Sequence, residues 1–396
     1  MKFRINNSLK FLVIVSCLGF VISSCNKALP DAEPIVTPPP SGSSINALLS
    51  DPDFSILKAA VTRAGTATTK LLSDSSAVFT FFAPNNAAFQ LSGIPNEASV
   101  AAFRAGQLDS IIRYHLIGGA KIKAADISSD FPNMYLQSDL IIAPPSATLP
   151  PGLRMPIFPA KNAGAAWVNN IPITQADIDA SNGVIHKVAA IILPPSQLLW
   201  QRIATDPDLA YLDSAIVRAD SGDAAKTLQS ALQNPAANLT VFAPTNLAFQ
   251  TILTGQITLA LIGQGMDPAT AQGTATYLAS TPAVFSNPAL ASVLTPTVVK
   301  GIIVYHLLGE RVFSVNIPTT PTAIPTLLNG AIAAHPGITI QATFGLTGVT
   351  AATVKGLGNA SASNVLINPT PAPNGTSDQH YINGTLHKID QVLIPQ

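Results

Sequence analysis

Histidine is the residue type here best suited to chemistry, and four of the six histidines occupy matching positions in two halves of the chain. The matching pairs are His115 with His306 and His186 with His387. A metal site or a general base in each half is one interpretation. Two histidines per half are too few for zinc unless carboxylates join them, and no His-Glu-x-x-His or comparable spacing occurs. We therefore predict no metal, and we expect each ring to hydrogen-bond to backbone groups in a core.

Other patterns that could support chemistry are incomplete. The run from Asp177 to Gly183 resembles the start of a calcium loop, but its glycine comes one residue late and Val188 replaces the bidentate glutamate. The sequence has no Gly-x-Ser-x-Gly elbow, phosphate loop or dinucleotide-binding glycine turn. We therefore predict no catalytic residues and no cofactor. A hydrolase built from scattered residues is the least favoured alternative.

Two copies of one apolar unit would position the histidines. Residues 78–90 and 239–250 each begin with a β-branched and aromatic run, which predicts a buried strand. Pro84 and Pro244 then remove a ladder donor and end that strand. The next residue, Asn or Thr, suits an N-cap, and Ala-Phe opens an amphipathic helix.

Three further landmarks recur in the same order and make the chain an internal repeat. They are Asp51-Pro-Asp with Asp206-Pro-Asp, Tyr114-His115 with Tyr305-His306, and Asn182-Gly-x-x-His with Asn383-Gly-x-x-His. We predict one domain over residues 45–195 and a second over 196–396, with an insertion around 254–297. The Pro194-Pro195 junction leaves almost no linker, so we expect the domains to reorient little.

These motifs together resemble a tandem of fasciclin domains, over roughly residues 45–396. The resemblance implies an α+β fold, in which each domain is a β-sandwich-like wedge flanked by short helices. It also implies adhesion without catalysis, and a partner-contact role for the tyrosine–histidine pairs Tyr114, His115, Tyr305 and His306. One departure is that the second copy continues its last motif as His387-Lys-Ile-Asp390, whereas the first has Ala189 where the family commonly has aspartate.

The insertion is a second candidate for recognition, because segments added to a scaffold are free of core constraints. Its four glycines among Ala, Thr and Gln predict short helices broken by turns. Met266, Tyr277 and Phe285 are its possible partner contacts. The alternative is that these side chains pack inward and extend the core.

The N-terminus predicts export and lipidation. Residues 1–24 have basic residues followed by the apolar run 11–22, as in a signal peptide. The run is followed by Ile22-Ser-Ser-Cys25, which resembles a bacterial lipobox, so we predict acylation of the Cys25 thiol as the membrane anchor. Residues 25–44 are the predicted tether, and their proline-rich part, residues 28–44, reaches about 50 Å at ~3.1 Å per residue. Asn26 would favour the outer membrane.

Composition restricts the partners. Loss of the signal leaves 18 basic against 21 acidic residues, and no basic stripe with aromatics appears, which argues against nucleic acid. We predict a surface-anchored adhesion or scaffolding protein that binds an extracellular protein or polysaccharide. The alternative is a glycan-capture component of an envelope polysaccharide-uptake system, which exposed tryptophan rings at Trp167 or Trp200 would favour.

Overall fold

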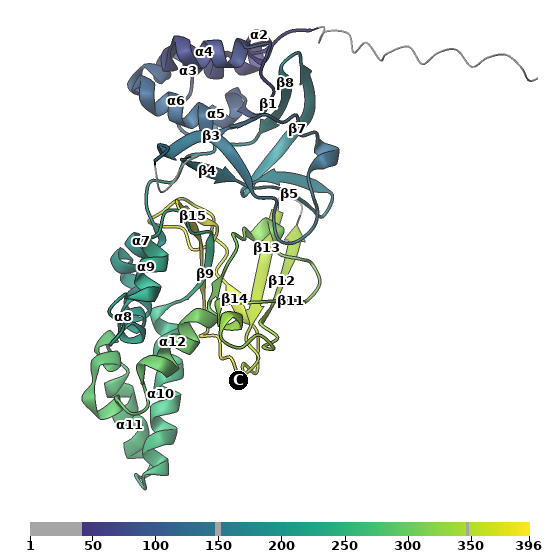
Figure 1. Cartoon of the computed structure of the whole chain (residues 1–396). Helices are drawn as coiled ribbons and strands as arrows, with labels where there is room; N and C mark the ends of the chain where they lie inside the picture. Colours follow the sequence, from purple (N-terminus) through teal and green to yellow (C-terminus); the bar gives the residue numbers. More distant parts are fainter. Residues whose placement is uncertain (1–41, 147–151, 346–347) are drawn as a thin grey trace, which may run out of the picture. The chain divides into compact units, whose positions relative to one another are not determined.

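The computed structural model describes residues 42–146, 152–345 and 348–396, and residues 42–396 form one compact unit. The predicted signal peptide, Cys25 and all but the last residues of the tether lie outside the described residues. The described chain contains two mixed repeats, each with its own sheet and its own helices (Figure 1). The predicted α+β class is confirmed.

The first repeat begins with helices and ends with strands. Its helices are α2 (Ile45–Leu48), α3 (Ser55–Ala64), α4 (Thr66–Ser73), α5 (Asn86–Leu91) and α6 (Ala105–Tyr114), with 3₁₀ helices η1 (Pro52–Phe54), η2 (Glu97–Ala102) and η3 (Ala124–Asp126). Its strands are β1 (Phe79–Pro84), β2 (Leu116–Gly118), β3 (Leu136–Ala143), β4 (Leu153–Ile157), β5 (Pro159–Asn162), β6 (Ala165–Val168), β7 (Ile171–Ala180) and β8 (Gly183–Val188). The six-stranded sheet has the order β2-β1-β8-β7-β6-β5, and β3 pairs with β4 separately.

The second repeat follows the same plan with more elements. Its helices are α7 (Leu199–Thr205), α8 (Ala210–Ala219), α9 (Thr227–Gln233), α10 (Asn246–Gly263), α11 (Pro268–Leu278) and α12 (Pro296–Tyr305), with η4 (Pro207–Leu209), η5 (Pro282–Ser286), η6 (Pro288–Leu290), η7 (Ser314–Asn316) and η8 (Leu327–Gly330). Its strands are β9 (Leu239–Pro244), β10 (Leu307–Leu308), β11 (Thr322–Ile324), β12 (Ile338–Gly345), β13 (Gly348–Lys355), β14 (Ser363–Val365), β15 (Gln379–Tyr381) and β16 (Gly384–Ile389). The eight-stranded sheet runs β10-β9-β16-β14-β13-β12-β11, with β15 on β16.

The signature unit forms as its sequence predicts. Strands β1 and β9 are buried throughout and end at Pro84 and Pro244. The Asn85 side chain then accepts a hydrogen bond from the backbone N–H of Ala88, and Thr245 accepts one from Ala248. These bonds satisfy donors that the first helical turn leaves free.

Each signature strand pairs in parallel with the strand that carries the later histidine. Phe82 on β1 is in register with His186 on β8, and Phe242 on β9 is in register with His387 on β16. The rings contact each other, with centroids 5.5 Å and 5.8 Å apart. The central parallel pair therefore places both histidines inside the fold.

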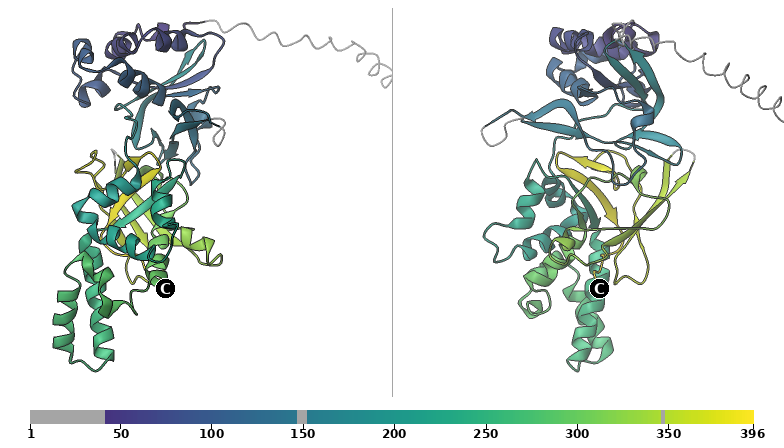
Figure 2. Two further views of the ribbon diagram at one scale, coloured as in Figure 1. Left: turned by 60° about the vertical axis from the view of Figure 1, so that its left-hand side comes forward. Right: turned by 45° about the vertical axis from the view of Figure 1, so that its right-hand side comes forward.

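The insertion departs from the prediction of short helices. Helix α10 continues for 18 residues through Gly255, and α11 returns alongside it, as the two views of Figure 2 show. An internal glycine costs a helix roughly 1 kcal/mol. Burial of Leu253 and Ile257 on either side of the glycine offsets that cost. Of the four glycines, Gly265 is the one that lies in a turn, and its φ is +91°.

Candidate functional site: the histidine clamps and the inserted helical hairpin

The histidine that follows each tyrosine joins the end of a helix to the last segment of its repeat. His115 donates from Nδ1 to the Ile111 carbonyl at 2.7 Å and accepts at Nε2 from the Ile192 N–H at 3.0 Å. His306 makes the same two bonds, to Ile302 at 2.8 Å and from Leu393 at 2.8 Å. One nitrogen donates and the other accepts, so each ring is neutral and both of its polar atoms are occupied.

Burial keeps these two rings uncharged. It lowers the pKa of His115 and of His306 to about 4, against the opposing effect of the carbonyl that each ring bonds. Both side chains are at most 1% exposed. They are therefore unavailable for direct contact with a partner in this fold, and they lack the pKa near neutrality that a general base needs.

The second histidine of each repeat is also held by backbone groups. His186 donates from Nε2 to the Ile122 carbonyl at 2.8 Å, and His387 donates to the Val312 carbonyl at 2.9 Å. Their Nδ1 atoms accept from the N–H groups of Asp177 and Asp378, both at 3.3 Å. The expectation that the rings bond backbone groups across the core is confirmed for all four. Within the described residues, no three His, Cys, Asp or Glu side chains gather to hold a metal.

The two tyrosines are equally internal. The Tyr114 hydroxyl donates to the Pro156 carbonyl at 3.2 Å, and the Tyr305 hydroxyl donates to the Gly337 carbonyl at 2.6 Å. Both side chains are fully buried, and burial raises the pKa of each phenol. In both repeats, the tyrosine–histidine pair therefore stabilises the fold through hydrogen bonds to backbone groups of other segments.

A buried arginine of the second repeat, Arg311, contacts the first repeat. The sequence did not predict this contact. Arg311 is 1% exposed and donates to His380 Nε2 at 2.7 Å and to the Tyr381 carbonyl at 3.2 Å. Its guanidinium lies 5.0 Å from the ring centroid of Phe158 in the first repeat. Burial lowers the pKa of Arg311 to about 10. In the sequence, Glu310-Arg311 lies within an apolar stretch, and no pattern there predicted that the arginine is buried.

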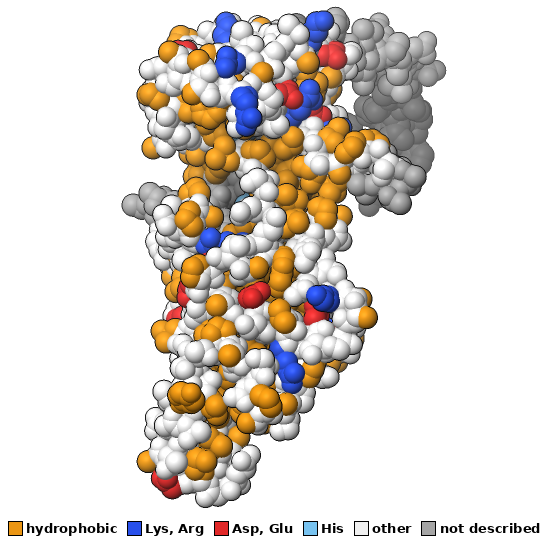
Figure 3. All heavy atoms as spheres, turned by 90° about the vertical axis from the view of Figure 1, so that its left-hand side faces the viewer, with side chains coloured by type: hydrophobic (Ala, Val, Ile, Leu, Met, Phe, Trp, Pro, Cys, Tyr) orange, Lys and Arg blue, Asp and Glu red, His pale blue; other side chains and the backbone are white. Residues whose placement is uncertain are grey.

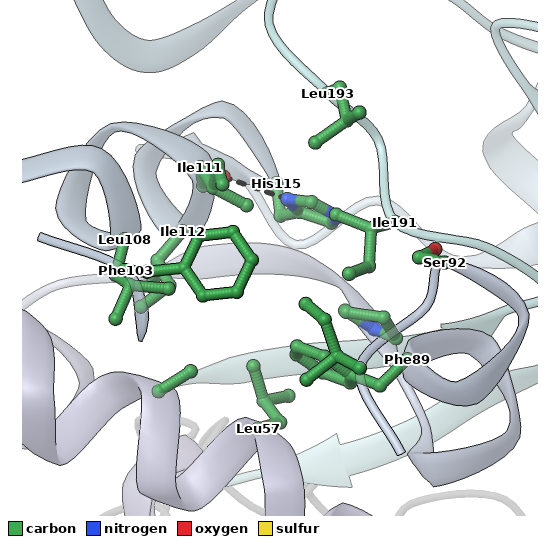
Figure 4. A pocket seen from close by; sticks show the side chains of 13 residues that line it. Leu57, Phe89, Ser92, Phe103, Leu108, Ile111, Ile112, His115, Ile191 and Leu193 are labelled. Carbon is green, nitrogen blue, oxygen red and sulfur yellow. Dashed lines mark hydrogen bonds between the residues drawn. The ribbon is translucent and has the colours of Figure 1, made fainter. Parts of the chain in front are cut away.

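An apolar hollow lies beside the first tyrosine–histidine helix (Figure 4). It has a volume of about 120 Å³. Phe89 from α5, Ile111 and Ile112 from α6 and Ile191 from the segment after β8 surround it, and His115 lies at one side. The lining offers one hydroxyl, that of Ser92, and no carboxylate or amine. This arrangement suits packing or an apolar ligand rather than acid–base chemistry.

The three predicted contact residues of the insertion differ in how far they are buried. Phe285 is buried and packs edge-on against Phe249 at 5.9 Å, so it extends the core. Tyr277 on α11 is 79% exposed, and Met266 in the turn after α10 is half-buried. The base of the insertion therefore belongs to the core, whereas its outer face is open to contact.

The outer face of the insertion is apolar and nearly uncharged. Residues 246–299 contain a single charged side chain, Asp267, which caps α11. Leu247 and Leu259 on α10 are 70% and 66% exposed. Figure 3 shows hydrophobic and uncharged side chains over the lower part of the molecule, where these helices lie. By length and composition alone α10 could cross a membrane, but Leu253 and Ile257 pack it onto the core.

Comparison with known proteins finds similarity to a known family in the first repeat. The fasciclin domain profile matches residues 52–194. Transforming growth factor-beta-induced protein ig-h3 from Sus scrofa is 30% identical over 164 residues, which cover 41% of this chain and 21% of that protein. Protein sll1483 from Synechocystis is 35% identical over 118 residues, which cover 30% of this chain and 56% of that protein. The chain therefore spans about a fifth to about half of these relatives.

A solved FAS1 domain pair from the insect cell adhesion molecule fasciclin I aligns with 88% of this chain and 94% of its own, at 14% identity and a TM-score of 0.32. The second repeat carries the same landmarks, the same central parallel pair and the same histidine hydrogen bonds as the first. Fasciclin domains are associated with cell adhesion and protein binding and are typically not enzymes. Residues 52–194 match the fasciclin domain family, and residues 196–396 repeat the landmarks of that segment, so the chain is similar to a tandem of fasciclin domains.

Proposed function

We propose that this chain is a non-catalytic adhesion or scaffolding lipoprotein that binds an extracellular protein through the outer face of α10 and α11. The observation that carries the proposal is the exposure of Leu247, Leu259 and Tyr277 on a pair of helices with one charged residue. Protein contacts favour such apolar and aromatic anchors, and charged residues are depleted at their centres. A folded scaffold with an exposed apolar addition is the arrangement expected of a binding module.

A polysaccharide partner is the second candidate, and Tyr277 is the observation in its favour. An exposed ring offers a face on which a sugar can stack, and this supports a glycan-capture role in polysaccharide uptake. The tryptophans do not add to it, because Trp167 is buried against Phe344 and Trp200 is half-buried on the core of the second repeat. Because neither tryptophan is exposed, a protein is the favoured partner.

Single substitutions on the outer face test the proposal. Tyr277→Ser and Leu259→Ser should each weaken partner capture at least tenfold, since a central interface anchor contributes about 2 kcal/mol or more. Both side chains are exposed, so the melting temperature should stay within about 2 °C. The measurement is pull-down from envelope extracts together with a glycan array, using residues 42–396.

Leu91→Ser is the matched control, because Leu91 is 79% exposed at the end of α5 in the first repeat. It should leave binding unchanged. Equal binding by all three variants would refute recognition by the hairpin. Loss of glycan binding alone would establish the polysaccharide alternative.

Anchoring is proposed from the sequence. Acylated Cys25 would hold the protein at the cell envelope, with the outer membrane favoured by Asn26. Cys25→Ala should shift the protein from the membrane to the soluble fraction or leave its precursor uncleaved. Membrane retention with acyl labelling in the variant would refute the lipid anchor.

A further inference from the structure

We propose that the second repeat binds one uncharged aliphatic chain in a cavity beneath the insertion, a ligand site that goes beyond the proposed adhesive function. The cavity has a volume of about 300 Å³. Phe249 and Leu253 of α10, Phe285 of η5, and Val299 and Ile302 of α12 supply apolar walls. It is therefore a hollow between the insertion and the tyrosine–histidine helix of this repeat.

The position of the cavity is built into the fold, because the first repeat has its smaller hollow at the same place. Phe89, Ile111 and Ile191 line the smaller one, and their repeat counterparts Phe249, Ile302 and Val392 line the larger one. Two hollows at equivalent positions are not a chance defect of packing. In the second repeat the volume rises from about 120 to about 300 Å³.

The walls of the two hollows differ on the side of the insertion. Phe103 and Leu108 close the hollow of the first repeat. In the second repeat, Leu294 and Val299 occupy the equivalent positions, and Phe285 of η5 in the insertion is added to the lining. Val293 and Val298 are 40% and 50% exposed at the rim, so the cavity opens to solvent.

The lining sets the chemistry of the ligand. No residue with a charged side chain lines the cavity, and its polar lining residues are Gln256 and Gln396. Apolar cavities of about 150 Å³ stay dry and hold a ligand the size of benzene, so twice that volume accepts a longer aliphatic chain. The amides can hydrogen-bond a hydroxyl or ester, whereas a carboxylate would lack a cation. The ligand class is thus a neutral chain with one polar end.

A series of straight-chain alcohols tests the site on the full chain. Titration of 1-butanol, 1-hexanol and 1-octanol is followed by calorimetry and by methyl NMR of labelled Ile, Leu and Val. Affinity should rise about fourfold for each added methylene until the cavity is full, at one alcohol per chain. Shifted methyl signals should include those of Leu253, Val299 and Ile302.

Two matched substitutions locate the binding. Ile302→Phe fills the cavity and should weaken 1-octanol binding at least tenfold. Ile111→Phe, at the equivalent position of the first repeat, should leave it unchanged. If Ile302→Phe lowers the melting temperature, Val298→Trp replaces it, because Val298 is half exposed and a ring there narrows the opening.

Three results would overturn the proposal. They are no saturable binding up to the solubility limit of 1-octanol, equal loss of binding in Ile111→Phe, and octanoate binding as tightly as the alcohol at neutral pH. The last result would mean that the head group is not selected for neutrality.

Discussion

The two repeats share a polar framework and differ in what is added around it. In both, a buried asparagine before the last strand ties three segments together. Asn182 accepts from the Ile45 N–H at 2.8 Å and donates to the Leu72 carbonyl at 3.0 Å. Asn383 accepts from Leu199 at 2.9 Å and donates to Leu232 at 2.8 Å. The framework thus preserves bonds between matching positions.

The threonine in each signature strand belongs to the same framework. Thr80 donates to the Ala120 carbonyl and accepts from the Ile122 N–H. Thr240 makes the corresponding bonds to Glu310 and from Val312. Buried polar groups cost free energy unless they are paired, so a change in one partner requires a change in the other. These internal hydrogen bonds are therefore common to both repeats, whereas the surface and the cavity differ between them.

The second repeat has a buried ion cluster at a position where the first has a more exposed ion pair. Asp206 is 7% exposed and lies 2.8 Å from the Arg202 guanidinium and 2.9 Å from Lys388 Nζ. In the first repeat, the equivalent Lys187 pairs instead with Asp53, and Asp51, the counterpart of Asp206, is exposed. The same lysine position therefore stabilises the two repeats to different extents.

Removal of the central carboxylate should give the largest effect. Asp206→Ala leaves the buried Arg202 guanidinium without its carboxylate and Lys388 with Asp208 alone, and should lower the free energy of unfolding by about 3–5 kcal/mol. Asp51→Ala is the matched control, because both aspartates cap the following turn through the N–H two residues on. It should cost only about 1 kcal/mol. Urea titration measures both, and equal losses would contradict the role of the cluster.

Acid should then weaken both repeats alike. The pKa of His115 and His306 is about 4 in the folded protein and ordinarily 6.5, so between these values the unfolded chain binds more protons. The contribution of these neutral rings to the free energy of unfolding is fully present above pH 6.5. It decreases as the pH falls towards 4, by roughly 3 kcal/mol for each ring.

The variants His115→Gln and His306→Gln separate this effect from the titration of carboxylates. Urea titrations at pH 7 and pH 4.5 should show a smaller acid-induced loss in each variant than in the parent chain. An unchanged loss would mean that the rings do not titrate as proposed.

The smallest effect concerns the aspartate that only the second repeat has in its last motif. Asp390 accepts from the Asn364 N–H at 2.8 Å and from the Ser363 hydroxyl at 2.9 Å. Asp390→Ala should cost about 1 kcal/mol, because its side chain is exposed. Ala189→Asp in the first repeat should change stability by less than about 0.5 kcal/mol. Thermal unfolding compares them, and a gain in the first repeat would show that it retains a matching pair of donors.

The local sequence was sufficient to predict the two signature units and the turn at Asn182-Gly183. A proline, a capping side chain and a β-branched run act within a few residues, so their consequences follow from their order along the chain. The family resemblance carried by these repeated signals implied the α+β class, and the position of the histidines within the repeats predicted that their rings are internal.

Tertiary structure alone decided the rest, because it depends on groups that are far apart in sequence. Nε2 of His306 meets a backbone N–H 87 residues away, and Arg311 finds its acceptors about 70 residues on. Glycine at 255 predicted a break, but burial of the neighbouring side chains kept the helix intact. The exposure of Tyr277 and the burial of Phe285 were likewise set by which helix face meets the core, and that face is defined only when the second repeat has folded.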